Sequence, residues 1–114
     1  MNSVITQLAG LTAALTVAAE ESPRGIAMQP LKAANERLLV VGIGLIAGSE
    51  LPEHDIPGEA TIQVLSGAVT LIVDGDETDL LADEIMEIPQ ARHRVRALGP
   101  STILLTQVKH DSRA

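Results

Sequence analysis

Residues 60–88 read ATIQVLSGAVTLIVDGDETDLLADEIMEI, a series of short apolar runs separated by turn signals. Apolar and polar residues alternate from Ala60 to Val64, and this period of two is typical of a strand with one buried face. Ser66-Gly67 ends that run, and Asp74-Gly75 lies between two further runs, where Asp-Gly strongly indicates a tight hairpin turn of the primed type. The stretch predicts strands at 60–65, 68–74, 77–82 and 84–88.

The same pattern continues on both sides of this stretch. Turn signals recur at roughly the 8–12-residue spacing that is typical of a β-sandwich or barrel, from Pro23 to the C-terminus. Further strands are expected at 26–32, 36–47, 92–98 and 102–109. The sequence therefore predicts an all-β domain with about eight strands.

Size and composition limit the function classes. The chain has 114 residues, which suits one domain whose core needs neither a disulfide nor a structural metal. Aromatic residues make up 0% of it and the formal net charge is −7, so stacking surfaces and a basic groove are both absent and nucleic acid is a poor partner. Because the chain has no cysteine, any metal site must use His, Asp, Glu or water.

Residues 1–22 predict an amphipathic helix. Ile5, Leu8, Leu11 and Leu15 recur three or four residues apart, and Asn2 or Ser3 can cap the start. The segment lacks the positive region of a secretory signal and is too polar and too short to span a membrane. We expect it to pack on the β-barrel of residues 23–114 in a single cytoplasmic domain with no membrane partner, and a signal peptide is the alternative.

The run ERLLVVGIGLIA at residues 36–47 is apolar on both faces. One face can line the barrel, and the other needs a cover. Either the N-terminal helix or a second subunit could supply that cover. We expect a homodimer, with the helix alone as the alternative.

Residues Gly48 to Val108 resemble the cupin superfamily of small jelly-roll barrels. Gly48 precedes His54 by the interval of the family's first motif, and Gly67 closes the following strand pair. The segment LLADEIMEIPQARHRV is similar to the second motif, with Pro89 at the proline and His93 at the histidine, although the loop between them is one residue shorter than usual. The resemblance implies an RmlC-like double-stranded β-helix with one N-terminal helix.

The resemblance also implies a metal site of three histidines and one glutamate, since a divalent metal needs several convergent N and O ligands. Ile56 occupies the second histidine position, and Ala60 stands where the glutamate should be. Glu59 is adjacent, but the strand period would aim it at the opposite face. His54 and His93 remain, so we expect no firmly bound cofactor. The alternative is a weakly bound divalent metal completed by water, substrate or a carboxylate such as Glu53, Asp55 or Glu87.

If the side chains of these strands point inward as they do in the cupin family, the resemblance implies a ligand pocket in the barrel lumen. Its polar features would be the two imidazoles, and its walls would be aliphatic. The expected lining residues are His54, Ile56, Ala60, Ile62, Val64, His93, Val95 and Ala97. The alternative is that these side chains fill a small barrel, with both histidines bonded to backbone carbonyls or to each other.

Three functions compete for this sequence. We favour a small stand-alone cupin that binds a small apolar or anionic metabolite without a full metal site, as a sensor, carrier or auxiliary protein. The first alternative is an enzyme using His54 and His93, either metal-dependent (oxygenase-like or hydrolytic) or a metal-free isomerase or lyase. The family's sugar-nucleotide epimerases rely on a tyrosine acid, and this chain has no tyrosine. The second alternative is a structural dimeric module with a filled barrel, which the absence of any pocket would indicate.

Two clusters of charge have ordinary explanations. The carboxylates between Asp74 and Glu87 lack the pattern of a calcium loop and predict a solvated hairpin tip. Arg92, Arg94 and Arg96 alternate along one expected strand, so they should point away from the lumen if His93 points inward. We expect them to form ion pairs with the acidic surface, and an anion-binding stripe is the alternative.

Overall fold

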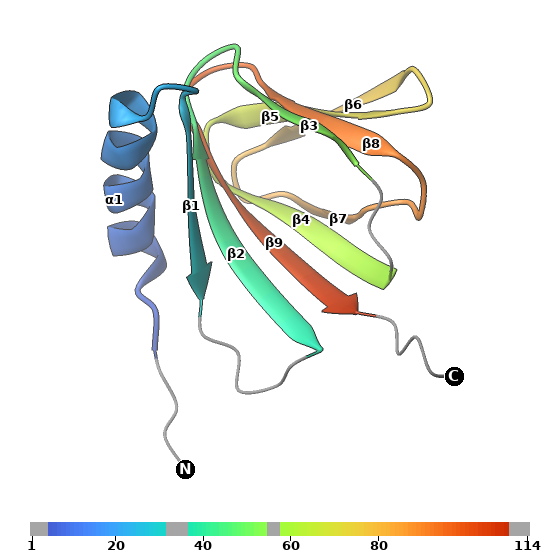
Figure 1. Cartoon of the computed structure of the whole chain (residues 1–114), viewed down its shortest axis with the longest axis horizontal. Helices are drawn as coiled ribbons and strands as arrows, with labels where there is room; N and C mark the ends of the chain where they lie inside the picture. The colour runs from blue at the N-terminus through green and yellow to red at the C-terminus, as the bar shows by residue number, and fades with distance from the viewer. Residues whose placement is uncertain (1–4, 32–36, 55–57, 110–114) are drawn as a thin grey trace.

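The computed structural model describes residues 5–31, 37–54 and 58–109, and these form one helix and nine strands (Figure 1). This confirms the all-β class with one N-terminal helix. In chain order the elements are α1 (Leu8–Glu21), β1 (Ile26–Leu31), β2 (Leu38–Leu45), β3 (Glu50–His54), β4 (Gly58–Ser66), β5 (Ala68–Val73), β6 (Asp76–Leu81), β7 (Ile85–Glu87), β8 (His93–Ala97) and β9 (Ser101–Lys109).

The strands form two antiparallel sheets. One sheet has the order β1-β2-β9-β4-β7, and the other has the order β3-β8-β5-β6. The two sheets face each other and α1 lies along β1 outside them (Figure 1). The alternating apolar residues of both sheets meet between them in one cluster of buried aliphatic side chains, which includes Leu45, Ile62, Leu71 and Ile103.

The β5–β6 hairpin confirms the predicted turn. Val73 pairs with Asp76, and the two residues between them have positive φ angles of 51° at Asp74 and 85° at Gly75. Positive φ at both central residues defines the primed turn that matches the twist of the flanking strands. Asn, Asp and Gly tolerate this conformation best, so the local sequence is sufficient to specify this hairpin.

The sequence signals miss β3. Its residues, ELPEH, include a proline and three charged or ionisable side chains, and they show no alternation of apolar and polar positions. The segment becomes a strand because it pairs with β8, with Glu50 opposite Arg96 and Leu51 opposite Val95. Such pairing depends on residues about forty positions away, which local propensity does not report.

The helix begins later than the sequence pattern indicates. It starts at Leu8 after Gln7, whose side chain makes no capping hydrogen bond, and the expected caps Asn2 and Ser3 lie outside the described residues. Ile5 lies before the helix and is 90% exposed, and the buried face consists of Leu11, Leu15 and Ala19. Those three positions are four residues apart and share one stripe of the helix.

Two glycines of β2 let α1 approach the sheet closely. A Cβ atom at Gly42 would lie 2.9 Å from Leu15 Cδ1, and one at Gly44 would press on the backbone carbonyl oxygen of Leu15. The helix therefore covers this part of the outer face of β2 within the same chain. Leu38 and Val108 lie further along the outer face and stay partly exposed, and the homodimer remains a prediction.

The close contact between α1 and β2 should not tolerate a side chain at Gly44. Gly44→Ala is expected to lower the free energy of unfolding by about 1–3 kcal/mol, because the methyl group would push the helix from the sheet. Urea unfolding followed by far-UV circular dichroism measures the change, since the chain has no aromatic side chains. Gly99→Ala is the matched control because no atom lies near its Cβ position. Equal stability of the two variants would contradict the close contact.

Two buried threonines differ in their hydrogen bonding. Thr70 Oγ1 donates a 2.7 Å hydrogen bond to Asp79 Oδ1 across the β5–β6 pair. Thr102 is 0% exposed on β9, between Gly44 and Ser66 of the neighbouring strands, and its hydroxyl has no hydrogen-bond partner among the described residues. A buried hydroxyl without a partner lowers stability.

Removing each hydroxyl should change stability in opposite directions. Thr102→Val is expected to raise the free energy of unfolding by about 1 kcal/mol, because it replaces an unsatisfied polar atom with a methyl group. Thr70→Val is expected to lower it by about 1 kcal/mol because Asp79 loses its donor. Urea titrations of both variants measure these changes in the free energy of unfolding. A destabilised Thr102→Val protein would show that the hydroxyl does have a partner.

Candidate functional site

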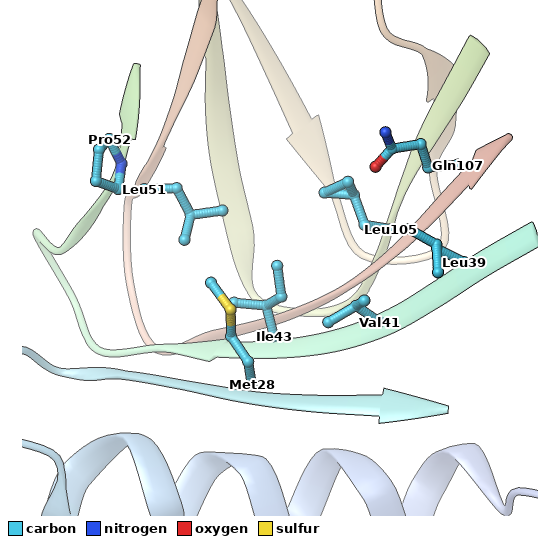
Figure 2. Close-up of a pocket in the computed structure, with 8 residues that line it drawn as sticks. All are labelled: Met28, Leu39, Val41, Ile43, Leu51, Pro52, Leu105 and Gln107. Carbon is cyan, nitrogen blue, oxygen red and sulfur yellow. The ribbon is translucent and has the colours of Figure 1, made fainter. Parts of the chain in front are cut away.

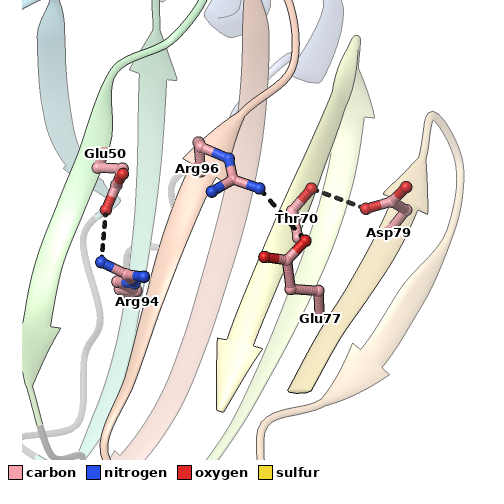
Figure 3. Close-up of polar contacts among 6 residues, drawn as sticks. All are labelled: Glu50, Thr70, Glu77, Asp79, Arg94 and Arg96. Atoms are coloured by element: carbon pink, nitrogen blue, oxygen red, sulfur yellow. Dashed lines mark hydrogen bonds and ion pairs between the residues drawn. The ribbon is translucent and has the colours of Figure 1, made fainter. Parts of the chain in front are cut away.

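The inner face of β8 carries His93, Val95 and Ala97. All three are buried between the sheets, and His93 is only 1% exposed. The intervening arginines point outward and form ion pairs with carboxylates (Figure 3). Arg94 Nη1 lies 3.5 Å from Glu50 Oε1, and Arg96 Nη2 lies 3.4 Å from Glu77 Oε1. The predicted alternation and the predicted ion pairs are confirmed for these two arginines. Exposed pairs of this kind contribute little to stability.

The inner face of β4 carries the other predicted lumen residues. Ala60, Ile62 and Val64 are buried, whereas Glu59 is exposed on the opposite face, as the strand period predicts. These side chains pack into the core with Val95 and Ala97, so this part of the barrel is filled. Ile56 lies outside the described residues. The role of this set as ligand contacts remains a prediction.

The backbone brings the two histidines of the cupin motifs together. After a bulge that follows Leu51, His54 stands opposite His93 in the β3–β8 ladder. The His93 ring lies with Nδ1 3.1 Å from the carbonyl oxygen of Ala91, a contact that orients the imidazole. The side chain of His54 is outside the described part of the structure. Two segments about forty residues apart in sequence thus meet at a single register position.

The residues at this position do not fit the metal site of the family. Ala60, the residue that the resemblance aligns with the family's glutamate, is buried among apolar side chains. Among the side chains that the structure describes, which do not include those of Glu53 and His54, no group of three or more His, Asp or Glu could hold a metal ion. Two imidazoles alone make a weak site.

A cavity of about 380 Å³ lies between β3 and the facing strands β1, β2 and β9 (Figure 2). Leu51 and Pro52 approach from β3, across the cavity from Leu105 and Gln107 of β9 (Figure 2). Ile43 and Leu51 are buried in the core, and Met28 is 58% exposed at the edge. The lining residues are Met28, Leu39, Val41, Ile43, Leu51, Pro52, Leu105 and Gln107.

Of the predicted pocket residues, the six whose side chains the structure describes are not among these eight: Ala60, Ile62, Val64, His93, Val95 and Ala97. The alternation of Leu39, Val41 and Ile43 on one face of the apolar run was the available signal in the sequence, and that face does point inward. The lining residues of β1 and β3 are Met28, Leu51 and Pro52, and they show no such alternation in the sequence. Their place beside the cavity depends on how strands that are distant in the chain are arranged. The cavity consequently lies on the β1–β2 side of the barrel interior.

The fold is shared with many solved structures. A conserved protein of unknown function from Streptococcus pyogenes matches with a TM-score of 0.74 and 20% identity, over 98% of this chain and 92% of that one. An RmlC-like cupin from Desulfovibrio desulfuricans matches at 0.66 and 29% identity over 73% and 81% of the two chains. A cupin superfamily protein from Desulfitobacterium hafniense matches at 0.69 and 17% identity over 75% and 78%. No protein-family model and no curated protein matches the sequence.

These similarities confirm the resemblance to the cupin superfamily at the level of the fold, and the chain has the jelly-roll fold of the RmlC-like cupins. The shared fold specifies neither a reaction nor a ligand. In the described part of the chain, no helix is both long and apolar enough to cross a membrane.

Restoring the missing ligands should create a metal site. The double variant Ile56→His and Ala60→Glu is expected to raise Ni²⁺ affinity by more than about 100-fold, because it adds two direct ligands to two imidazoles. Isothermal titration calorimetry measures the affinity. In the control, Ile56→His is combined with Thr61→Glu, whose carboxylate lies on the outer face of β4. Equal affinities of the two double variants would show that Ala60 does not occupy the glutamate position.

Proposed function

We propose that this cupin binds a small, largely apolar molecule in the cavity between β3 and strands β1, β2 and β9. The observation that carries the proposal is the lining of the 380 Å³ space: seven side chains are apolar and one, Gln107, is polar. Small-molecule sites typically combine an apolar wall with a few polar groups that orient the ligand. The volume also lies within the range of such sites.

The surroundings of the cavity suit a preformed site. Ile43 and Leu51 belong to the buried core, so the inner wall is held by packing that is independent of any ligand. Met28 stands at the exposed edge, where its flexible thioether chain can adapt to different shapes. Covering these exposed apolar groups with a ligand removes them from water, which supplies the driving force for binding.

The proposed role is that of a carrier, a sensor or an auxiliary protein. Catalysis at His54 and His93 is a second candidate, and the register that sets the two residues opposite each other favours it. The two candidates can be tested separately, because His93 is not among the residues that line the cavity and the cavity can be altered at Val41. Substitutions in the cavity therefore test the binding proposal without removing an imidazole.

Filling the cavity with a larger side chain should weaken the binding of an apolar probe. Val41→Phe is expected to weaken binding of the neutral fluorescent probe N-phenyl-1-naphthylamine by at least about tenfold, since the ring occupies the space that the ligand needs. Probe fluorescence is easily read because the wild-type chain has no aromatic residues. Native mass spectrometry of the same samples should show loss of any retained organic mass, and the spectra also report whether the protein is a homodimer.

The matched control for Val41→Phe is Val40→Phe. Val40 is the preceding residue of β2 and faces the outer side of the sheet, so the same substitution adds the same ring outside the cavity. Probe binding should stay within about twofold of the wild-type value in this variant. If Val40→Phe and Val41→Phe weaken the probe equally, or if the wild-type protein binds no probe, the binding proposal is wrong.

A further inference from the structure

The geometry of Gln107 points to the chemical class of the ligand. We infer that the cavity takes a neutral aliphatic molecule whose single polar group both donates and accepts hydrogen bonds, such as a primary amide or an alcohol, and that Gln107 selects it. This inference rests on the proposed function. It makes Gln107 the residue that determines specificity in the cavity.

Gln107 is polar in surroundings that offer it no partner. Its neighbours across the sheet are Leu39 on β2 and Ala60 on β4, and Leu105 precedes it on the same face of β9. None of these side chains can form a hydrogen bond. The half-buried amide of Gln107 makes no hydrogen bond with any described residue, although it lines the cavity. Its donor and acceptor atoms are therefore available to a bound molecule.

The chemistry of the amide favours a neutral head group. The side chain of Gln107 presents one acceptor oxygen and two donor hydrogens, so a primary amide can use both kinds of atom at once. A carboxylate could use only the donors. It would also lose its hydration in an apolar cavity, where none of the described lining residues carries a positive charge. The formal net charge of −7 further disfavours an anion.

The remaining lining residues indicate the size and the apolar character of the rest of the ligand. Leu39, Val41 and Leu105 form an aliphatic wall beside Gln107, since Leu39 pairs with Gln107 and Val41 pairs with Leu105 across β2 and β9. The space of 380 Å³ equals the volume of about a dozen water molecules. A chain of medium length that ends at Gln107 would fit this space and cover the wall.

A matched series of eight-carbon compounds tests the inference. Octanamide, 1-octanol, octanoate and octane are used to displace N-phenyl-1-naphthylamine from the wild-type protein at pH 8, where octanoate is fully ionised. Octanamide and octanol should displace the probe at concentrations at least about tenfold lower than octanoate does. In Gln107→Leu the probe should still bind, and the advantage of octanamide over octane should fall by about tenfold.

Gln63→Leu is the control variant. Gln63 lies on the outer face of β4, opposite Leu104, so the same substitution there removes an amide that does not line the cavity. The four compounds should displace the probe from Gln63→Leu at the same relative concentrations as from the wild-type protein. The inference is overturned if octanoate binds as tightly as octanamide, or if Gln107→Leu keeps the wild-type advantage of octanamide over octane. Those results would leave the binding proposal intact, because that proposal depends on the probe and the Val41→Phe variant.

Discussion

Burial of aliphatic side chains between two antiparallel sheets is the interaction on which the rest of this structure depends. With no aromatic residue in the chain, the interior is filled by Leu, Ile, Val and Ala, and buried side chains of this kind from β4, β5, β8 and β9 belong to one cluster. The same short side chains do not reach across between β3 and strands β1 and β2. The cavity lies where the two sheets are not bridged by side chains.

The outer layer of the molecule follows from the same constraint. The outer face of β2 must be covered, and its two glycines bring α1 near enough for Leu11 and Leu15 to cover it. On the opposite side, the outer face of β8 is polar and its arginines are matched by carboxylates of β3 and β6. The helix thus covers part of one sheet, and the charged residues of β8 face outward from the other sheet.

The resemblance to the cupin motifs includes two histidines and does not include the glutamate. His54 and His93 pair in the β3–β8 ladder, whereas Ala60, the residue that the resemblance aligns with the glutamate, packs in the core. A methyl group at that position cannot balance the charge of a metal ion. Recognition of an apolar molecule needs only a shaped wall and one hydrogen-bonding group, and the cavity beside Gln107 provides both.

The sequence by itself determined the features that depend on near neighbours. Alternation placed Ala60, Ile62 and Val64 inside and Arg94 and Arg96 outside, and Asp74-Gly75 specified its hairpin, because a strand has a period of two and a primed turn needs positive φ. Only the tertiary structure decided the rest. Strand β3 and the cavity on the β1–β2 side both arise from contacts between segments far apart in the chain. Local propensity contains no information about such contacts, since their free energy comes from burial that exists only after the sheets have assembled.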